Sequence, residues 1–239
     1  MLPQLLIKPG FVDQHDCNAL IQFLEGLPGW RNASHGDLNE RKHYNYLVND
    51  VFSEPSATQN IKDIVRTFQA RKKAAIEDFF GETLVQTSRA SFRKWVPGDF
   101  QSPHCDVGHA DGELIFTNTE DSLSLHHYDF ATVTYLNHNF EGGQIYFHHH
   151  GVEIIPTQGL MIAFPASPQY LHGVREITSG NRYIITSFWP RARTIVHNLI
   201  PSLGARWWND VENVDEVMSL IPEQEKHRIN PALLPPQHD

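Results

Sequence analysis

The chain has 239 residues, of which 40% are hydrophobic and 20% charged, so it suits a soluble globular protein and excludes wholesale disorder or a fibrous repeat. Its formal net charge of -9 argues against duplex nucleic acid as the main partner, because phosphate binding needs a basic surface. The two cysteines, Cys17 and Cys105, indicate neither a disulfide framework nor a thiolate metal site, and no run of apolar residues is long enough for a membrane span. We expect a cytoplasmic protein with no nucleic acid or membrane partner.

Two amphipathic helices are predicted in the first third of the chain. Apolar residues recur at helical spacing after Asp13, and Gly29 follows as a stop signal. A second periodic run begins at Ser56, which forms a capping-box pattern with Gln59, and it ends at Gly81. We expect both helices to pack on a sheet.

The middle of the chain has the residue composition and turn spacing of a β protein. Residues 84–189 consist of short runs rich in Val, Ile, Thr, Tyr and Phe, separated by turns such as VPGD and TSGN, which predicts a β-sandwich or barrel. Residues 191–239 return to helical and Pro-rich sequence. We therefore expect one domain over 1–239, with helical support in 1–82, a β core in 83–190 and a C-terminal helical extension and tail.

The polar segment between Asp106 and Tyr128 is long for a compact β core. Loops of that size are usually functional or disordered. A lid over a site and an irregular surface excursion explain the segment equally well.

A His-x-Asp pair, His104 and Asp106, lies inside a predicted strand. Residues i and i+2 of a strand project from the same face, so these two side chains aim at one point while Cys105 points away. His172, at the start of another strand-like run, is the candidate for a third ligand. Two imidazoles and a carboxylate on one face of an octahedron suit non-haem Fe(II) better than the closed tetrahedron of zinc. The pair alone is a weak signal in a chain with 15 histidines.

Arg182 adds weight to this metal hypothesis. It lies beyond His172, in a strand that we expect to run alongside that of His172, and the apolar residues 183–185 follow it. A buried guanidinium needs a carboxylate or phosphate partner, which a dicarboxylate cosubstrate would supply. An internal salt bridge or a surface position is the alternative.

Four blocks between residues 84 and 190 carry a family resemblance. They are WVPGDFQSPHCD, TVTYLNHNFEGGQIYF, GLMIAFP and HGVREITSGNRYIITSFW. In this order and spacing they resemble the 2-oxoglutarate- and Fe(II)-dependent dioxygenases, in particular the prolyl 4-hydroxylase-like branch. The resemblance implies an α+β, mainly β fold: a double-stranded β-helix, or jelly-roll, with flanking N-terminal helices and a C-terminal helix.

The resemblance also implies roles for single residues. His104, Asp106 and His172 would be the Fe(II) ligands, and Arg182 would bind the distal carboxylate of 2-oxoglutarate. Further cosubstrate contacts would come from Tyr135, from Thr186 on the same strand face as Arg182, and from Trp95.

Three positions indicate where the chain stands within this family. Trp95 stands where many relatives have Tyr, and Asp129 stands where relatives often have Arg, which puts the usual substrate contacts in doubt. Because Asp106 is present, no coordination position is vacant for a halide, and hydroxylation is favoured over halogenation.

The implied activity is that of an enzyme that uses Fe(II), 2-oxoglutarate and O2, with ascorbate as a candidate reductant. Our leading hypothesis is hydroxylation of an unactivated C-H in a small amino-acid-like metabolite, free or carrier-bound, with release of succinate and CO2. The alternatives are a prolyl or other peptidyl hydroxylase acting on a protein or peptide, and a non-enzymatic cupin-like jelly-roll that binds a metal or another ligand. A homodimer is left open.

Arg89, Arg93 and Lys94 form a small basic set near the proposed site. One face of their strand could contact a substrate carboxylate. A solvated strand edge is an equal alternative.

Two other conspicuous motifs are assigned to turns. The triplet His148–His150 is predicted as an exposed hairpin tip rather than a second metal site, because it ends at Gly151. Gly142 and Gly143 are predicted as a turn or bulge next to the pocket.

Overall fold

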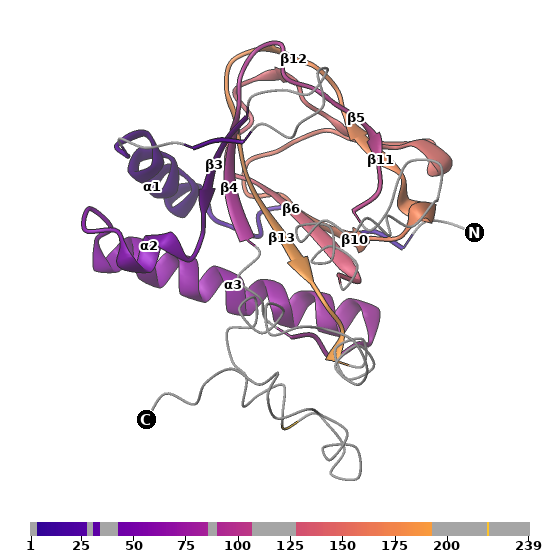
Figure 1. The fold of residues 1–239 in the computed structure, drawn as a ribbon, viewed down its shortest axis with the longest axis horizontal. Coiled ribbons are helices and arrows are strands. Elements are labelled where there is room, and N and C mark those ends of the chain that lie inside the picture. Colours follow the sequence, from indigo (N-terminus) through magenta and orange to yellow (C-terminus); the bar gives the residue numbers. More distant parts are fainter. Residues whose placement is uncertain are drawn as a thin grey trace, which may run out of the picture.

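Antiparallel sheets form the body of the protein (Figure 1). The computed structural model describes residues 4–27, 31–33, 43–85, 90–106, 128–192 and 219. Within these residues the strands form a seven-stranded sheet, a four-stranded sheet and a two-stranded ribbon. The seven-stranded sheet has the order β1 (Leu6–Lys8), β10 (Met161–Pro165), β6 (Phe130–Tyr135), β13 (Arg182–Trp189), β4 (Ala90–Trp95), β3 (His43–Leu47) and β2 (Arg31–Ala33).

The second sheet faces the first and completes a jelly-roll. Its order is β5 (Gln101–His104), β11 (His172–Val174), β8 (Ile145–Phe147) and β9 (Val152–Ile154), and the ribbon pairs β12 (Ile177–Ser179) with β7 (Glu141–Gly142). In Figure 1, β5 and β11 lie on the opposite side of the molecule from β3 and the helices. The predicted mainly β, α+β jelly-roll is therefore confirmed.

Strand β13 shows how the sequence divides the two faces of the large sheet. Tyr183, Ile185 and Trp189 belong to the apolar cluster beneath the helices, whereas Ile184 belongs to the cluster between the sheets. This alternation follows from the two-residue period of a strand. Arg182 shares the inner face with Ile184, so the pleat itself turns the guanidinium towards the interior.

Helix α1 (Gln14–Glu25) begins and ends at identifiable caps. The Asp13 carboxylate accepts a hydrogen bond from the backbone N-H of Asp16 at 2.8 Å, as an N-cap residue should. The helix ends at Gly26, whose N-H is bonded to carbonyls of the last turn. We expected Gly29 to be the stop signal; this was wrong, because the last-turn carbonyls are already satisfied at Gly26.

Helix α3 (Gln59–Phe80) confirms the second predicted helix but not its expected cap. Thr58, not Ser56, is the N-cap residue and accepts from the Ile61 N-H at 3.4 Å. The Ser56 hydroxyl instead donates to Glu54 at 2.8 Å in the preceding turn. The helix ends at Gly81 in the left-handed conformation, as predicted. A short helix, α2 (Asp50–Ser53), had no predicted counterpart.

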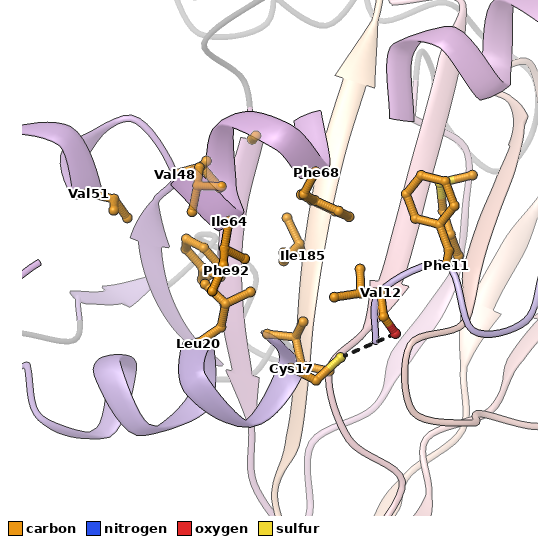
Figure 2. Close-up of a cluster of buried hydrophobic side chains, with 14 of the residues drawn as sticks. Phe11, Val12, Cys17, Leu20, Val48, Val51, Ile64, Phe68, Phe92 and Ile185 are labelled. Atoms are coloured by element: carbon orange, nitrogen blue, oxygen red, sulfur yellow. Dashed lines mark hydrogen bonds between the residues drawn. The ribbon is translucent and has the colours of Figure 1, made fainter. Parts of the chain in front are cut away.

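The helices cover the outer face of the large sheet, as expected. Figure 2 shows side chains of α1 and α3 meeting those of β4 and β13, among them Leu20, Ile64, Phe92 and Ile185. Each of these side chains is buried. This contiguous core holds the large sheet rigid. The other face of the sheet carries none of the described helices and is available for a site.

Lys72 of α3 is an unusual member of this layer because it is fully buried, at 0% exposure. Its Nζ donates to Ser187 Oγ on β13 at 2.7 Å and lies 4.0 Å from the centre of the Phe68 ring. Burial lowers the pKa of Lys72 well below its ordinary value, since an ammonium in an apolar layer loses its hydration.

One predicted strand neighbour is wrong. We expected the strand of Arg182 to run beside that of His172, but β13 pairs with β4 and β6, whereas β11 pairs with β5 and β8. Between them the chain forms β12 in the ribbon and turns at Gly180, with φ +74°, so it reaches the other sheet. His172 and Arg182 therefore face each other across the interior.

Two further predictions concern segments that the structure does not describe. The predicted C-terminal helix and the candidate lid between Asp106 and Tyr128 lie outside the described residues, apart from residue 219. None of the described helices is long and apolar enough to cross a membrane.

Candidate metal centre

A cavity of about 500 Å³ lies between the inner faces of the two sheets. His104 and His172 line it from the four-stranded sheet, and Arg182 and Thr186 line it from the seven-stranded sheet. Its volume falls within the range of about 300–1,000 Å³ that is typical of small-molecule sites.

His104, Asp106 and His172 meet at one side of this cavity. His104 of β5 and His172 of β11 are directly opposite each other in the antiparallel register. Each residue of the trio offers one ligand atom, and these atoms all lie within 4.8 Å of one another. The Nε2 atoms of the two imidazoles lie 3.8 Å from the Asp106 oxygens Oδ1 and Oδ2 respectively. The structure thus brings together the three side chains that we predicted as ligands.

The secondary structure around Asp106 differs from the prediction. We expected His104 and Asp106 to alternate within one strand, but β5 ends at His104 and Asp106 lies in a turn just beyond. Cys105 between them is buried and also lines the cavity, although we expected it to point away. The turn still directs the carboxylate towards the imidazoles.

Backbone carbonyls orient both imidazole rings. His104 Nδ1 lies 3.0 Å from the Ser102 carbonyl oxygen, and His172 Nδ1 lies 3.0 Å from that of Tyr170. With Nδ1-H donating to a carbonyl, each ring presents the lone pair of Nε2 to the cavity, which is the usual arrangement behind a metal-binding histidine. Burial, with His172 beside it, lowers the pKa of His104 to about 4, so its neutral ligand form is favoured.

The Asp106 carboxylate supports a cation at this position. Its Oδ2 is buried and has no hydrogen-bond partner among the described residues. A buried carboxylate oxygen without a partner is costly, and a metal ion would satisfy it. Two imidazoles and one carboxylate are also the donor set that suits ferrous iron with open positions.

Arg182 lies buried at the opposite side of the cavity, with 1% exposure. Its Nη2 is 3.4 Å from the Tyr135 hydroxyl, and its guanidinium carbon is 5.0 Å from the ring centres of both Tyr135 and Trp95. Nε and Nη1 have no hydrogen-bond partner among the described residues. An aromatic-walled guanidinium with two unused donor atoms suits the carboxylate end of a dicarboxylate.

The other two predicted cosubstrate contacts line the same cavity. Trp95 is opposite Arg182 in the β4–β13 register and is 2% exposed, so it forms a wall of the anchor. Thr186 lies on the same side of β13 as Arg182 and contributes to the cavity surface.

Gly143, in the predicted glycine turn, packs closely against Arg182. Its φ is +68°, and a Cβ there would lie 3.0 Å from Arg182 Cδ and would collide with Ile177 Cδ1. Only glycine combines that backbone conformation with the space that Arg182 needs. The predicted turn next to the pocket is confirmed.

Some cavity residues escaped the sequence analysis. Gln101 is the first residue of β5, three residues before His104, and its Nε2 is 3.2 Å from His104 Nε2. Asn45 comes from β3, a strand that we did not predict because the segment before Ser56 has no clear period. Asp129 is not a cavity residue, since it binds the backbone and guanidinium of Arg191 at 2.7 and 2.8 Å.

Two other histidine-containing groups among the described residues lie apart from the cavity. His148–His150 form a short 3-10 helix at the tip of the β8–β9 hairpin, as predicted. A second group of possible metal ligands, Asp13, His15 and Asp16, lies at the start of α1 with Asp13 and His15 exposed.

A family model connects this site with known chemistry. Residues 86–190 match the model described as the 2OG-Fe(II) oxygenase superfamily. The chain contains a 2OG-Fe(II) oxygenase domain. The matched segment includes all three predicted iron ligands and Arg182, and the predicted family is confirmed. No curated protein is a significant sequence relative of this oxygenase.

Solved structures share the fold of the oxygenase at low sequence identity. An oxidoreductase of the 2OG-Fe(II) oxygenase family from Burkholderia pseudomallei has 18% identity and a TM-score of 0.56, over 78% of this chain and 85% of that one. A prolyl hydroxylase from Trichoplax adhaerens, in complex with a hypoxia inducible factor peptide fragment, has 16% identity and a TM-score of 0.58, over 80% and 85%. Viral collagen prolyl hydroxylase from Paramecium Bursaria Chlorella virus-1, as a 2OG complex, has 15% identity and a TM-score of 0.52, over 78% and 95%.

These findings settle the enzyme class. The fold is the double-stranded β-helix that these solved structures share. The family match identifies the protein as a non-haem iron dioxygenase whose cofactors are Fe(II), 2-oxoglutarate and O2. The alternative of a non-enzymatic cupin-like binding protein loses its support.

Proposed function

We propose that His104, Asp106 and His172 hold the ferrous ion of this oxygenase. The observation that carries the proposal is the convergence of their three ligand atoms within 4.8 Å, with the Asp106 Oδ2 atom buried and without a hydrogen-bond partner among the described residues. We further propose that Arg182, with Tyr135, Trp95 and Thr186, holds the distal carboxylate of 2-oxoglutarate. The two unused donor atoms of the Arg182 guanidinium support this.

The protein's part in the reaction is to position the reactants and exclude water. The iron and 2-oxoglutarate together supply oxidation by O2, with decarboxylation of 2-oxoglutarate to succinate and transfer of an oxygen atom to a C-H bond. Apolar side chains such as Ile184 and Phe164 line the cavity and keep competing water away from the reacting carbon.

We propose a small amino-acid-like metabolite, free or carrier-bound, as the primary substrate. The cavity volume of about 500 Å³ suits a small molecule beside the cosubstrate. The cavity surface beyond Arg182 also carries the polar side chains Asn45, Ser91 and Arg93, which can recognise a small polar molecule.

A peptidyl hydroxylase is the second candidate. It is favoured by the likeness to a prolyl hydroxylase whose structure contains a peptide fragment, and to a viral collagen prolyl hydroxylase. The two candidates differ in what must reach the metal: a whole molecule for a metabolite, or one side chain of an extended polypeptide.

Succinate release distinguishes them. Purified protein is incubated with Fe(II), ascorbate, 2-oxoglutarate and either single amino acids or Pro-containing peptides with blocked ends, and succinate is measured. We expect amino acids to stimulate succinate release above the uncoupled rate. Stimulation by the peptides alone would replace the metabolite proposal with the peptidyl one.

Matched variants connect that activity with the proposed ligands. His172→Ala should abolish succinate formation, whereas His15→Ala, which removes an exposed imidazole from the surface group, should preserve it. Full activity of His172→Ala would contradict the assignment of the iron ligands.

A further inference from the structure

We propose that Arg93 and Asn45 form the substrate-recognition pair of this oxygenase, and that the substrate presents a free carboxylate to Arg93 and a neighbouring N-H group to Asn45. This inference rests on the proposed function, since it concerns the substrate of the same cavity. It narrows the substrate class to compounds that keep an unmodified acid group beside an amine or amide.

The strand register brings the two side chains together on the cavity side of the large sheet. Arg93 of β4 is opposite Asn45 of β3 on one side and opposite Ile184 of β13 on the other. All three residues line the cavity. Because strand neighbours in register share a face, the three form one row across the sheet floor.

The row lies next to the proposed cosubstrate anchor. Trp95 is two residues along β4 from Arg93 and is opposite Arg182 in the register. Residues two apart on a strand are neighbours on the same face, so the Arg93 row is one step from the Arg182 row. A substrate held at Arg93 would therefore lie beside 2-oxoglutarate and not in its place.

Charge supports an anionic ligand at this row. The Arg93 guanidinium is buried, which lowers its pKa to about 10, so it remains a cation at neutral pH. Asp106 favours that cation and Arg182 opposes it, which places the guanidinium within the field of both. Arg93 lines the cavity, and a guanidinium suits a carboxylate because it can donate two parallel hydrogen bonds to it.

Asn45 supplies a complementary polar atom. Its Oδ1 is buried and has no hydrogen-bond partner among the described residues. A buried amide oxygen of this kind accepts an N-H or O-H, and leaving it unsatisfied costs free energy. A carboxylate bound to Arg93 with an amino nitrogen bound to Asn45 is the pattern of an amino acid rather than of a mid-chain peptide residue, whose carboxyl is an amide.

A different role for Arg93 has to be distinguished. Since Arg93 is in the field of Asp106, it could act as a positioning residue for the metal carboxylate. Such a role would alter metal affinity and the uncoupled conversion of 2-oxoglutarate, and it would not discriminate between acid and amide forms of a substrate.

The test compares matched substrate pairs. Free amino acids and their carboxamides are supplied to wild type, Arg93→Met and Asn45→Ala with Fe(II) and 2-oxoglutarate, and kcat/KM for coupled succinate release is measured. The control is Lys94→Met, which removes a cation from the outer face of the same strand, where Lys94 pairs with Glu25 at 2.9 Å. Binding of the same pairs to the Mn(II)-loaded protein with 2-oxoglutarate is followed by calorimetry, and Mn(II) affinity is measured for each variant.

We expect wild type and Lys94→Met to prefer the acid over the carboxamide by about 10- to 100-fold, the effect of a hydrogen bond to a charged group. Arg93→Met should lose that preference in both turnover and binding and keep its Mn(II) affinity. Asn45→Ala should weaken binding of the acid and keep the preference.

Three outcomes would overturn the inference. If wild type uses acids and carboxamides equally well, the substrate carboxylate is not recognised and this inference fails. The proposed metabolite hydroxylase would be unaffected by that result. Unchanged preference in Arg93→Met, or a loss of Mn(II) affinity in that variant instead of a loss of preference, would assign Arg93 to another role. If blocked peptides stimulate turnover and no free amino acid does, the proposed function and this inference both fail.

Discussion

Several polar side chains that line the cavity of this oxygenase have a buried atom without a hydrogen-bond partner among the described residues, which points to a ligand. Asp106 Oδ2, Asn45 Oδ1 and two nitrogens of Arg182 are buried without hydrogen-bond partners among the described residues. Native proteins leave few such atoms, because each one costs about 1–3 kcal/mol when no partner is present. Their concentration around one cavity supports a site that is completed by a metal, a cosubstrate and a substrate.

Replacement of Arg182 tests the cosubstrate anchor. We expect Arg182→Met to raise KM for 2-oxoglutarate by about 100-fold or more, because it removes one partner of a buried charge pair. Arg182→Lys keeps the positive charge but loses the planar guanidinium. Its KM for 2-oxoglutarate should therefore lie between those of wild type and Arg182→Met. The measurement is uncoupled succinate formation against 2-oxoglutarate concentration. An unchanged KM in Arg182→Met would show that the dicarboxylate binds elsewhere.

Lys72 gives a stability prediction that is independent of catalysis. Its folded-state pKa lies well below the ordinary value of 10.5, so the unfolded chain binds more protons. Stability should therefore rise with pH between the folded-state pKa and about 10.5, by at most about 1.4 kcal/mol per pH unit. Lys72→Met should flatten this dependence and raise the free energy of unfolding at neutral pH by about 1–3 kcal/mol.

Urea unfolding at several pH values measures both effects. The control is Lys73→Met, which removes the neighbouring lysine that pairs with Glu77 at 3.0 Å and is partly exposed. A surface pair contributes little, so this variant should keep the pH dependence of wild type. A Lys72→Met protein with that same dependence would mean that Lys72 is not the group responsible.

At the scale of elements, the site depends on how closely two segments approach. The β7–β8 connection passes Arg182 so closely that Gly143 has no room for a side chain. The glycine turn therefore sets the position of the proposed cosubstrate anchor from outside the strand that carries it.

Gly143→Ala tests this packing. The added methyl should displace Arg182 and raise KM for 2-oxoglutarate by roughly 10-fold, since misplacing a charged hydrogen-bonding group costs about that factor. Gly151→Ala is the matched control, because Gly151 also has a positive φ, at +61°, and a Cβ there meets nothing within 4 Å. Both variants should lose similar stability. Equal KM values for the two would contradict the proposed coupling between the turn and Arg182.

The elements also show which parts of the site the sequence can predict. The periods of α1 and α3 and the alternation within β13 are local, and those predictions are confirmed. The neighbours of β13 and β11 depend on a crossover between sheets that no local pattern records, so the predicted adjacency was wrong. Asn45 could not be found because β3 is short and takes its place through pairing with β4, not through its own period.

For the whole molecule, the proposed ligands and anchor join two sheets. His104 and His172 belong to the four-stranded sheet, and Arg182 belongs to the seven-stranded sheet. A metal bound to the first sheet and a dicarboxylate that reaches the second would bridge them, and both would bind only the folded state. Ligand binding should therefore stabilise the fold as a whole.

Thermal unfolding measures this linkage. We expect Mn(II) to raise Tm and 2-oxoglutarate to raise it further only when Mn(II) is present. At a ligand concentration of 100 Kd the gain corresponds to about 2.7 kcal/mol. Asp106→Ala should abolish both increments. Stabilisation of that variant equal to wild type would show that the metal binds at another site.

The most direct test of the central claim is a crystal structure of the protein grown with Mn(II) and 2-oxoglutarate, with the metal located by its anomalous scattering. The account predicts one strong peak within coordination distance of His104 Nε2, His172 Nε2 and the Asp106 carboxylate, and a 2-oxoglutarate whose far carboxylate is bound to Arg182. A metal found only at the surface group of Asp13, His15 and Asp16, or a cosubstrate carboxylate away from Arg182, would contradict it.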